Sequence, residues 1–216
     1  NPVPKGALVS FVTTPDHVRL RAAVWPARTG QPRGTVCLFQ GRSEFIEKYF
    51  EVVEELLERG FSVATLDWRG QGGSQRLVRN PLGGHVSSFA DYDTDLTSFA
   101  RDVVLPDCPA PYYALAHSMG GLGLLRNATI KGIWFERAVC TAPLIDMPDS
   151  AVPWDVAFSL ARALKRIGLG RAVIPRFIYE NFYNPARAFP GNPLTRDAAR
   201  FARMLDIIEA DPGLAQ

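Results

Sequence analysis

Short apolar runs alternate with longer stretches of helical spacing from residue 8 to residue 141, and this alternation restricts the fold more than any other feature of the sequence. The apolar runs have the length of strands and end at turn residues. The stretches between them place apolar residues every three to four positions. Strands that alternate with helices need right-handed crossovers and form a parallel sheet covered by helices on both faces. The predicted strands are Leu8–Val12, Val18–Val24, Thr35–Phe39, Phe61–Leu66, Tyr112–Ala116 and Phe135–Thr141, and the predicted helices are Phe45–Arg59, Phe89–Val104 and Met119 to the region of Asn127.

The first two predicted strands are an exception, because the turn residues Thr14-Pro15-Asp16-His17 between them favour a hairpin. A hairpin places antiparallel strands at one edge of the sheet. Gly60 stands where a helix C-terminus is expected, and Pro106 closes the second predicted helix. The sequence therefore predicts an α/β fold with a mostly parallel sheet and helices on both of its faces.

After Pro143 the sequence changes character, and residues 145–216 contain no convincing strand. Two amphipathic stretches, Val152–Ile167 and Thr195–Ala210, have the spacing of helices. We therefore predict a core formed by residues 1–144 and a helical lid or cap formed by residues 145–216. The apolar faces of the two stretches include Trp154, Leu160, Leu164 and Phe201.

The charge of the chain argues against a nucleic acid as its partner. The 24 basic and 22 acidic residues are spread along the sequence and give a net charge of +2, with no basic tract. No run of about 18 apolar residues occurs, so we expect no membrane-spanning helix. The first residues lack the pattern of a signal peptide, and the absence of an initial Met suggests a processed or trimmed chain.

Three cysteines, Cys37, Cys108 and Cys140, cannot all pair with one another. Cys37 and Cys140 lie in apolar, strand-like runs, which indicates buried thiols and a reducing, cytoplasmic compartment. No motif surrounds any of the three, so a cysteine nucleophile is disfavoured.

Ser118 is the strongest candidate for a catalytic residue. A predicted strand runs into a sharp turn with Ser118 at its tip, and a helix starts at Met119. This arrangement is typical of a nucleophile elbow, in which a strained backbone presents the serine oxygen above the sheet. Such a turn needs small residues two positions before and after the serine, where Ala116 and Gly120 stand. The alternative, a serine that only caps the helix, is disfavoured by the strand that precedes it.

Four segments follow one another in a specific order along the chain. They are Gln40-Gly41-Arg42-Ser43-Glu44, then Asp67-Trp68-Arg69-Gly70-Gln71-Gly72-Gly73-Ser74, then Gly84-His85-Val86 with Phe89, Asp91 and Tyr92, and finally Ala116–Gly121. Together they resemble the α/β-hydrolase fold and, within it, the monoacylglycerol lipase and lysophospholipase-like (serine aminopeptidase-like) family. In that family the first segment is an oxyanion loop of pattern His-Gly-x-x-Glu. Gln40 stands in place of the His, and we expect it to preserve the hydrogen bonding that supports the loop.

The resemblance implies a serine carboxylic-ester hydrolase that forms an acyl-enzyme on Ser118. It makes the backbone N–H groups of Met119 and Arg42 the oxyanion donors. It implies no metal or organic cofactor. Two alternatives stay open, namely a peptidase that removes small N-terminal residues and a non-catalytic binding protein of the same fold.

The resemblance also bears on substrates, favouring monoacylglycerols, lysophospholipids or similar small acyl esters. The apolar residues of the lid, named above, would then line an acyl-chain pocket, although packing of the lid on the core explains each of them equally well. The lid could also allow transient contact with a membrane surface.

The other members of a catalytic triad are not evident. In this fold the order along the chain is Ser, then an acid, then His, and the last two follow later strands. His117 adjoins the serine but should point away from it, and neither His17 nor His85 is a convincing base. Asp146 is the nearest candidate acid, but it lies where the lid begins. We therefore expect the acid and the histidine on two further strands beyond Gln216, without which the last strand here would have an uncovered edge.

Two acidic patterns have structural explanations. Asp67 and Arg69 could serve as an acid and a substrate clamp, but we expect them to tie their loop together. The alternation of Asp91, Asp93 and Asp95 suggests a calcium-binding loop, yet it lacks the glycine and the glutamate that such a loop requires. An acidic helix start is the favoured interpretation.

Overall fold

The computed structural model describes residues 2–80, 83–132, 134–146, 153–171, 189 and 195–214. The chain divides into two compact units, one of Asn1–Ile145 with Ile207–Gln216 and one of Asp146–Asp206. The boundary between a core and a lid at residue 145 stays a prediction.

The first unit contains a six-stranded sheet in the order β1-β2-β4-β3-β5-β6. β1 pairs with β2 and β2 with β4 in antiparallel fashion, whereas the pairs β4–β3, β3–β5 and β5–β6 are parallel. The predicted hairpin and the predicted, mostly parallel sheet are therefore confirmed. The strands are β1 (Leu8–Thr13), β2 (Arg19–Trp25), β3 (Thr35–Phe39), β4 (Ser62–Leu66), β5 (Tyr112–His117) and β6 (Arg137–Thr141).

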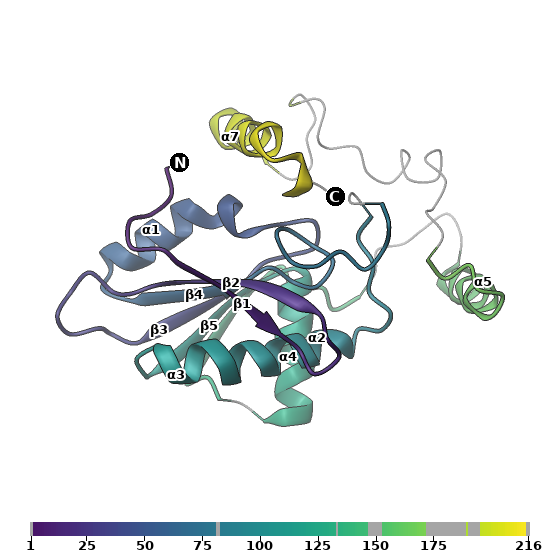
Figure 1. The fold of residues 1–216 in the computed structure, drawn as a ribbon, viewed down its shortest axis with the longest axis horizontal. Helices are drawn as coiled ribbons and strands as arrows, with labels where there is room; N and C mark the ends of the chain where they lie inside the picture. Colours follow the sequence, from purple (N-terminus) through teal and green to yellow (C-terminus); the bar gives the residue numbers. More distant parts are fainter. Residues whose placement is uncertain are drawn as a thin grey trace. The chain divides into compact units, whose positions relative to one another are not determined.

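Helices cover both faces of this sheet, as predicted. α1 lies on one face, and α2, α3 and α4 lie on the other (Figure 1). The helical elements of this unit are the 3₁₀ turn η1 (Ile46–Tyr49), α1 (Phe50–Glu58), α2 (Asp91–Phe99), the π-helical η2 (Ala100–Val104), α3 (Leu105–Asp107), α4 (Met119–Lys131) and the 3₁₀ turn η3 (Pro212–Leu214).

The prediction that Pro106 closes the second helix is wrong. The helical run starts at Asp91 and continues past Val104 through the short α3, which contains Pro106. Proline normally breaks a helix because it lacks an N–H and its ring meets the carbonyl four residues earlier. Here the five residues before α3 form a wider π-helical turn, which changes the hydrogen-bond register ahead of the proline. The helix therefore ends at Asp107.

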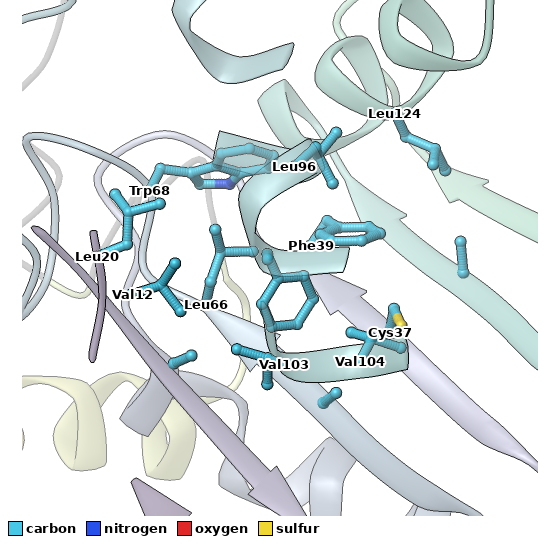
Figure 2. Close-up of a cluster of buried hydrophobic side chains, with 14 of the residues drawn as sticks. Val12, Leu20, Cys37, Phe39, Leu66, Trp68, Leu96, Val103, Val104 and Leu124 are labelled. Carbon is cyan, nitrogen blue, oxygen red and sulfur yellow. The ribbon is translucent and has the colours of Figure 1, made fainter. Parts of the chain in front are cut away.

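Each face of the sheet has its own apolar core. Val53 and Leu57 of α1 pack with Trp25 and Val63 on one face. On the other face, side chains of α2, η2 and α4 pack around Phe39, whose ring lies 6.0 Å from that of Trp68 and 6.1 Å from that of Phe99. Figure 2 shows part of this second cluster, including Val12, Leu20, Phe39, Leu66, Trp68, Leu96, Val103, Val104 and Leu124.

β6 forms one edge of the described sheet. It pairs with β5, and among the described strands it has no second neighbour. Four of its five residues are exposed, and Val139 is 59% exposed. The expected uncovered edge is present in this part of the chain.

The second unit contains α5 (Trp154–Arg166) and most of α7 (Ala198–Ala210). Both helices fall within the stretches for which the sequence predicts them, although Val152 lies outside the described residues. The rings of Trp154 and Phe158 lie 5.8 Å apart on α5. None of the helices in the described ranges is long and apolar enough to cross a lipid bilayer.

Candidate active site

Ser118 lies at the junction of β5 and α4, in a backbone conformation that is rare for a residue other than glycine. Its φ is 49° and its ψ is −116°. Backbone hydrogen bonds hold the turn, because Ser118 N donates to Thr141 O at 3.1 Å and Ser118 O accepts from Leu122 N and Leu144 N at 3.2 and 3.0 Å. Strain of this kind costs on the order of 1–3 kcal/mol and persists only where the surroundings fix it. The strand–turn–helix geometry predicted for Ser118 is therefore present.

The residues that flank this turn are small because neighbouring backbone comes close to them. Ala116 is fully buried in β5. A Cβ on Gly120 would lie 2.3 Å from Phe39 O and 2.7 Å from Gln40 O, which are backbone atoms at the end of β3. Glycine is therefore required at position 120, and the first turn of α4 lies directly against the loop that follows β3.

That loop, residues 40–44, also approaches the serine. A Cβ on Gly41 would lie 3.2 Å from Ser118 Cβ and 3.3 Å from His117 Cδ2. Gly41 is not among the glycines with positive φ, so close approach explains this residue better than a plain turn does. The structure thus brings the loop that carries Arg42 next to Ser118 and Met119, which the sequence separates by more than seventy residues.

Two backbone N–H groups of the loop donate hydrogen bonds to side chains. Gly41 N donates to Glu44 Oε2 at 2.7 Å, and Ser43 N donates to Gln71 Oε1 at 2.5 Å. Ser43 has a φ of 58°, so the loop turns sharply there. No hydrogen-bond partner of the Arg42 N–H is found among the described residues. Glu44 and Gln71 have no role predicted from the sequence, although both lie within the segments that carry the family resemblance.

Gln40 and Asp67 support the loop from behind. Gln40 is 1% exposed; its Nε2 donates to Asp67 Oδ1 at 3.2 Å, and Thr65 Oγ1 donates to its Oε1 at 3.3 Å. The expected supporting hydrogen bonds of Gln40 are therefore confirmed. Asp67 also accepts from Ile46 N at 3.0 Å and from Arg21 Nε at 2.6 Å. Burial raises the pKa of Asp67 to about 6, although Arg21 acts in the opposite direction.

Arg69 joins a second buried network, as the structural interpretation predicts. It donates to Asp95 Oδ1 from Nε at 2.9 Å and to Asp16 Oδ2 from Nη1 at 2.6 Å. Its hydrogen bond to Asp16 lowers the pKa of that carboxyl to about 2, whereas burial raises the pKa of Asp95 to about 6. Asp67 and Arg69 thus tie the loop after β4 to the rest of the sheet.

The histidines are not placed to activate the serine. His117 Nδ1 lies 3.1 Å from Thr141 O and 3.0 Å from Thr141 Oγ1, so its ring is held against the end of β6. His17 lies in the hairpin turn, and His85 Nε2 lies 3.5 Å from Ser87 Oγ. Within the described residues, no histidine or carboxylate is hydrogen-bonded to the Ser118 hydroxyl.

The other candidate residues lie elsewhere. Asp91 begins α2, and Asp91 and Asp93 occupy its first turn, which confirms an acidic helix start. Among the described residues, no group of three or more His, Cys, Asp or Glu side chains is placed to hold a metal ion. The predicted acyl-chain residues lie in the second unit, with Leu160 and Leu164 exposed on α5 and Phe201 buried on α7. Their role in a pocket stays a prediction.

Comparison with known proteins identifies relatives over most of the chain. A family model described as serine aminopeptidase, S33 matches residues 30–213. Lysophospholipase L2 of Escherichia coli (strain K12) is 34% identical over 192 residues, which cover 82% of this chain and 51% of that protein. A putative monoglyceride lipase of Schizosaccharomyces pombe is 27% identical over 188 residues, covering 84% and 45%. The chain therefore spans about half the length of the curated relatives it matches.

Solved structures resemble the chain in fold. A monoacylglycerol lipase of Paleococcus ferrophilus aligns with a TM-score of 0.64 at 24% identity, covering 91% of this chain and 64% of that one. The α/β hydrolase GrgF of Penicillium sp. sh18 aligns with a TM-score of 0.64 at 18% identity, covering 97% and 68%. At these identities the comparisons establish the fold.

Proposed function

Since the chain belongs to the serine aminopeptidase S33 family and has the α/β-hydrolase fold, we propose that it is a serine hydrolase of acyl esters with Ser118 as its nucleophile. The observation that carries the proposal is the strained turn at Ser118, which lies beside a loop whose Arg42 N–H has no partner among the described residues. Met119 starts α4, and no hydrogen-bond partner of its N–H is found in the part of the chain that the structure describes.

In the proposed reaction, Ser118 Oγ attacks the acyl carbonyl and transfers its proton to a histidine base. The carbonyl oxygen becomes an oxyanion, which the N–H groups of Met119 and Arg42 bind. The protonated histidine returns its proton to the leaving alcohol, and an acyl-enzyme forms on Ser118. Water then attacks this ester, with the same base and the same oxyanion donors, and releases the fatty acid.

The substrates we propose are monoacylglycerols, lysophospholipids or related single-chain esters. Relatives described as lysophospholipase L2 and putative monoglyceride lipase support this class. We propose that residues 145–216 form a lid whose apolar side chains contact the acyl chain. Leu160 is 60% exposed on α5, and Arg162 and Arg166 lie on the opposite side of the same helix, an arrangement suited to transient contact with a lipid surface. The residues proposed for the acyl chain are Trp154, Leu160, Leu164 and Phe201.

A second candidate function is removal of N-terminal residues from peptides, because the matching family model is described as a serine aminopeptidase. The two reactions share the nucleophile and the oxyanion donors, so the leaving group distinguishes them. Release of nitroaniline from aminoacyl nitroanilides would favour the peptidase. A non-catalytic binding protein would neither hydrolyse esters nor react with a fluorophosphonate probe, which labels only activated serines.

The test is hydrolysis of nitrophenyl esters of graded acyl length by the full-length protein and by Ser118→Ala. We expect hydrolysis by the wild type with a maximum at a particular chain length, and a loss of at least about 10³-fold in Ser118→Ala. A variant that keeps the wild-type rate would refute the role of Ser118. Equal folding of the two proteins is checked by circular dichroism.

We also propose a reducing, cytoplasmic location. Cys37 and Cys108 are buried free thiols, and Cys140 is a half-buried free thiol in β6. The prediction of burial is thus confirmed for Cys37 and corrected for Cys140, because β6 lies at the edge of the described sheet. Free thiols of this kind are common where the environment keeps them reduced.

A further inference from the structure

We propose that Glu44 and Gln71 are positioning residues that shape the loop of residues 40–44, so that the Arg42 N–H stays available for the oxyanion. The inference rests on the proposed function, and it assigns roles to two side chains that do not touch the substrate. Glu44 is the last residue of this loop, whereas Gln71 reaches it from the segment that follows β4.

The loop has three consecutive backbone N–H groups, at residues 41, 42 and 43, and each could donate to a nearby oxygen. Glu44 Oε2 accepts the first at 2.7 Å, and Gln71 Oε1 accepts the third at 2.5 Å. Within the described residues the middle one, at Arg42, has no partner. The two side chains therefore fix the orientation of the peptide groups on either side of the N–H that the reaction needs.

The surroundings of Glu44 make it a firm acceptor. Lys48 Nζ donates to Glu44 Oε1 at 2.5 Å, and Tyr49 O–H donates to Glu44 Oε2 at 2.5 Å. Burial alone would raise the pKa of Glu44, but Lys48, Tyr49 and the Gly41 N–H outweigh it, so the pKa is lowered. The carboxylate is ionised at neutral pH and receives three hydrogen bonds, which are stronger to a charged acceptor than to a neutral one.

The Glu44 carboxylate and the residues that hold it also lie close to the reacting serine. Lys48 and Tyr49 belong to η1, which leads into α1, and Ile46 at its start donates to the buried Asp67. Gly41 approaches both Glu44 and Ser118, since its added Cβ would lie 2.9 Å from Glu44 Oε2 and 3.2 Å from Ser118 Cβ. A shift of the Glu44 carboxylate would therefore move the loop relative to Ser118. A change of about 1 Å in such geometry can lower a rate by on the order of 10²-fold.

The test compares Glu44→Ala, Glu44→Gln and Gln71→Leu with wild type in the full-length protein. Steady-state hydrolysis of a short nitrophenyl ester gives kcat and KM, and binding of an alkyl boronic acid reports affinity for a mimic of the oxyanion intermediate. We expect Glu44→Ala to lower kcat by on the order of 10²-fold with KM unchanged, and to weaken boronate binding by a similar factor. Glu44→Gln keeps an acceptor oxygen and should recover most of kcat. Gln71→Leu should lower kcat by on the order of 10-fold.

The matched control is Glu54→Ala on α1, which breaks an exposed ion pair with Arg28 and does not touch the loop. It should leave kcat, KM and boronate binding unchanged. A folded Glu44→Ala with wild-type kcat, or one in which only KM rises, would overturn the inference. So would equal losses in Glu44→Gln and Glu44→Ala, since the acceptor oxygen would then not matter.

Hydrogen exchange of the loop separates this inference from the proposed function. We expect the backbone amides of Gly41 and Ser43, which are hydrogen-bonded in wild type, to exchange faster in Glu44→Ala than in wild type or Glu54→Ala. If wild type hydrolyses no ester, the proposed function fails, and the exchange experiment still decides whether Glu44 holds the loop. Unchanged exchange in Glu44→Ala would refute the positioning role whatever the activity.

Discussion

Replacement of Gly120 by Ala tests the close approach between α4 and the end of β3. The added Cβ would lie 2.3 Å from Phe39 O, whereas such contacts are essentially never shorter than 3.0 Å, so the two backbones must separate by at least 0.7 Å. The atoms are backbone, and no side chain can rotate away. We therefore expect the steric contact to lower the free energy of unfolding by about 3 kcal/mol, near the upper end of what overpacking a core costs.

Part of that cost is offset, because alanine favours a helix over glycine by about 1 kcal/mol. The expected net loss in the free energy of unfolding is about 2 kcal/mol, or a fall in Tm of about 4–8 °C for a chain of this size. Hydrolysis should fall as well, since the displaced backbone leads into the loop that contains Arg42. Urea unfolding followed by circular dichroism measures the first effect, and nitrophenyl ester hydrolysis measures the second.

Gly123→Ala is the matched control in the same helix. Its added Cβ would lie 3.2 Å from Trp68 Cη2, a side-chain atom that can shift by a few tenths of an ångström. The stabilisation from higher helix propensity should then roughly offset the cost of this contact, so the free energy of unfolding should change by no more than about 1 kcal/mol. Equal stability of the Gly120 and Gly123 variants would refute the argument that backbone approach at the elbow requires glycine.

Three further predictions concern charges and thiols. Arg21→Met should lower the free energy of unfolding by about 3–5 kcal/mol at pH 8, because the fully buried Asp67 would lose its paired cation. The folded-state pKa of Asp67, already raised to about 6, would rise further, so urea unfolding should show a smaller decrease in the free energy of unfolding at pH 5 than at pH 8. Asp16→Asn should lower the free energy of unfolding by about 1 kcal/mol or less at pH 7, since Asp16 is half exposed. The pKa of Asp16 is lowered to about 2, so this decrease should vanish as pH falls from about 4 to about 2, and an unchanged decrease at pH 2 would contradict the ion pair with Arg69. A disulfide reagent should modify Cys140 first and Cys37 only on unfolding, because Cys37 is fully buried and burial raises its thiol pKa well above the usual value. Fast modification of Cys37 in the native protein, monitored by mass spectrometry, would contradict the packing of the core.

Local sequence patterns were sufficient to predict most of the core architecture. The hairpin turn at residues 14–17, the continuous apolar run Thr35–Phe39 and the strand–turn–helix at Ser118 each have a signal within about ten residues. General rules of chirality then lead us to expect right-handed crossovers, whereas the order of the strands comes from the structure alone. The approach of Gly120 to the backbone at the end of β3, and of Gly41 to the side chain of Ser118, could be anticipated only in part, from the motifs themselves.

Features that depend on contacts between distant segments could not be predicted in this way. The π-helical turn before Pro106 replaces a helix end that proline normally produces. The hydrogen bond from Ser43 to Gln71 joins loops that follow different strands, and no periodicity encodes it. The half-buried state of Cys140 follows from its place on an edge strand, which an apolar run alone does not distinguish from a central one.

The edge position of β6 has a practical consequence for handling the chain by itself. Among the strands that the structure describes, β6 pairs only with β5, so its other side can pair with an added extended peptide, including the same strand of another molecule. Electrostatic repulsion would do little to prevent this, because the sequence pI is about 8.5 and the net charge at neutral pH is only +2. Mildly acidic buffers of low ionic strength should therefore keep the chain monomeric, and mildly alkaline buffers should promote its aggregation.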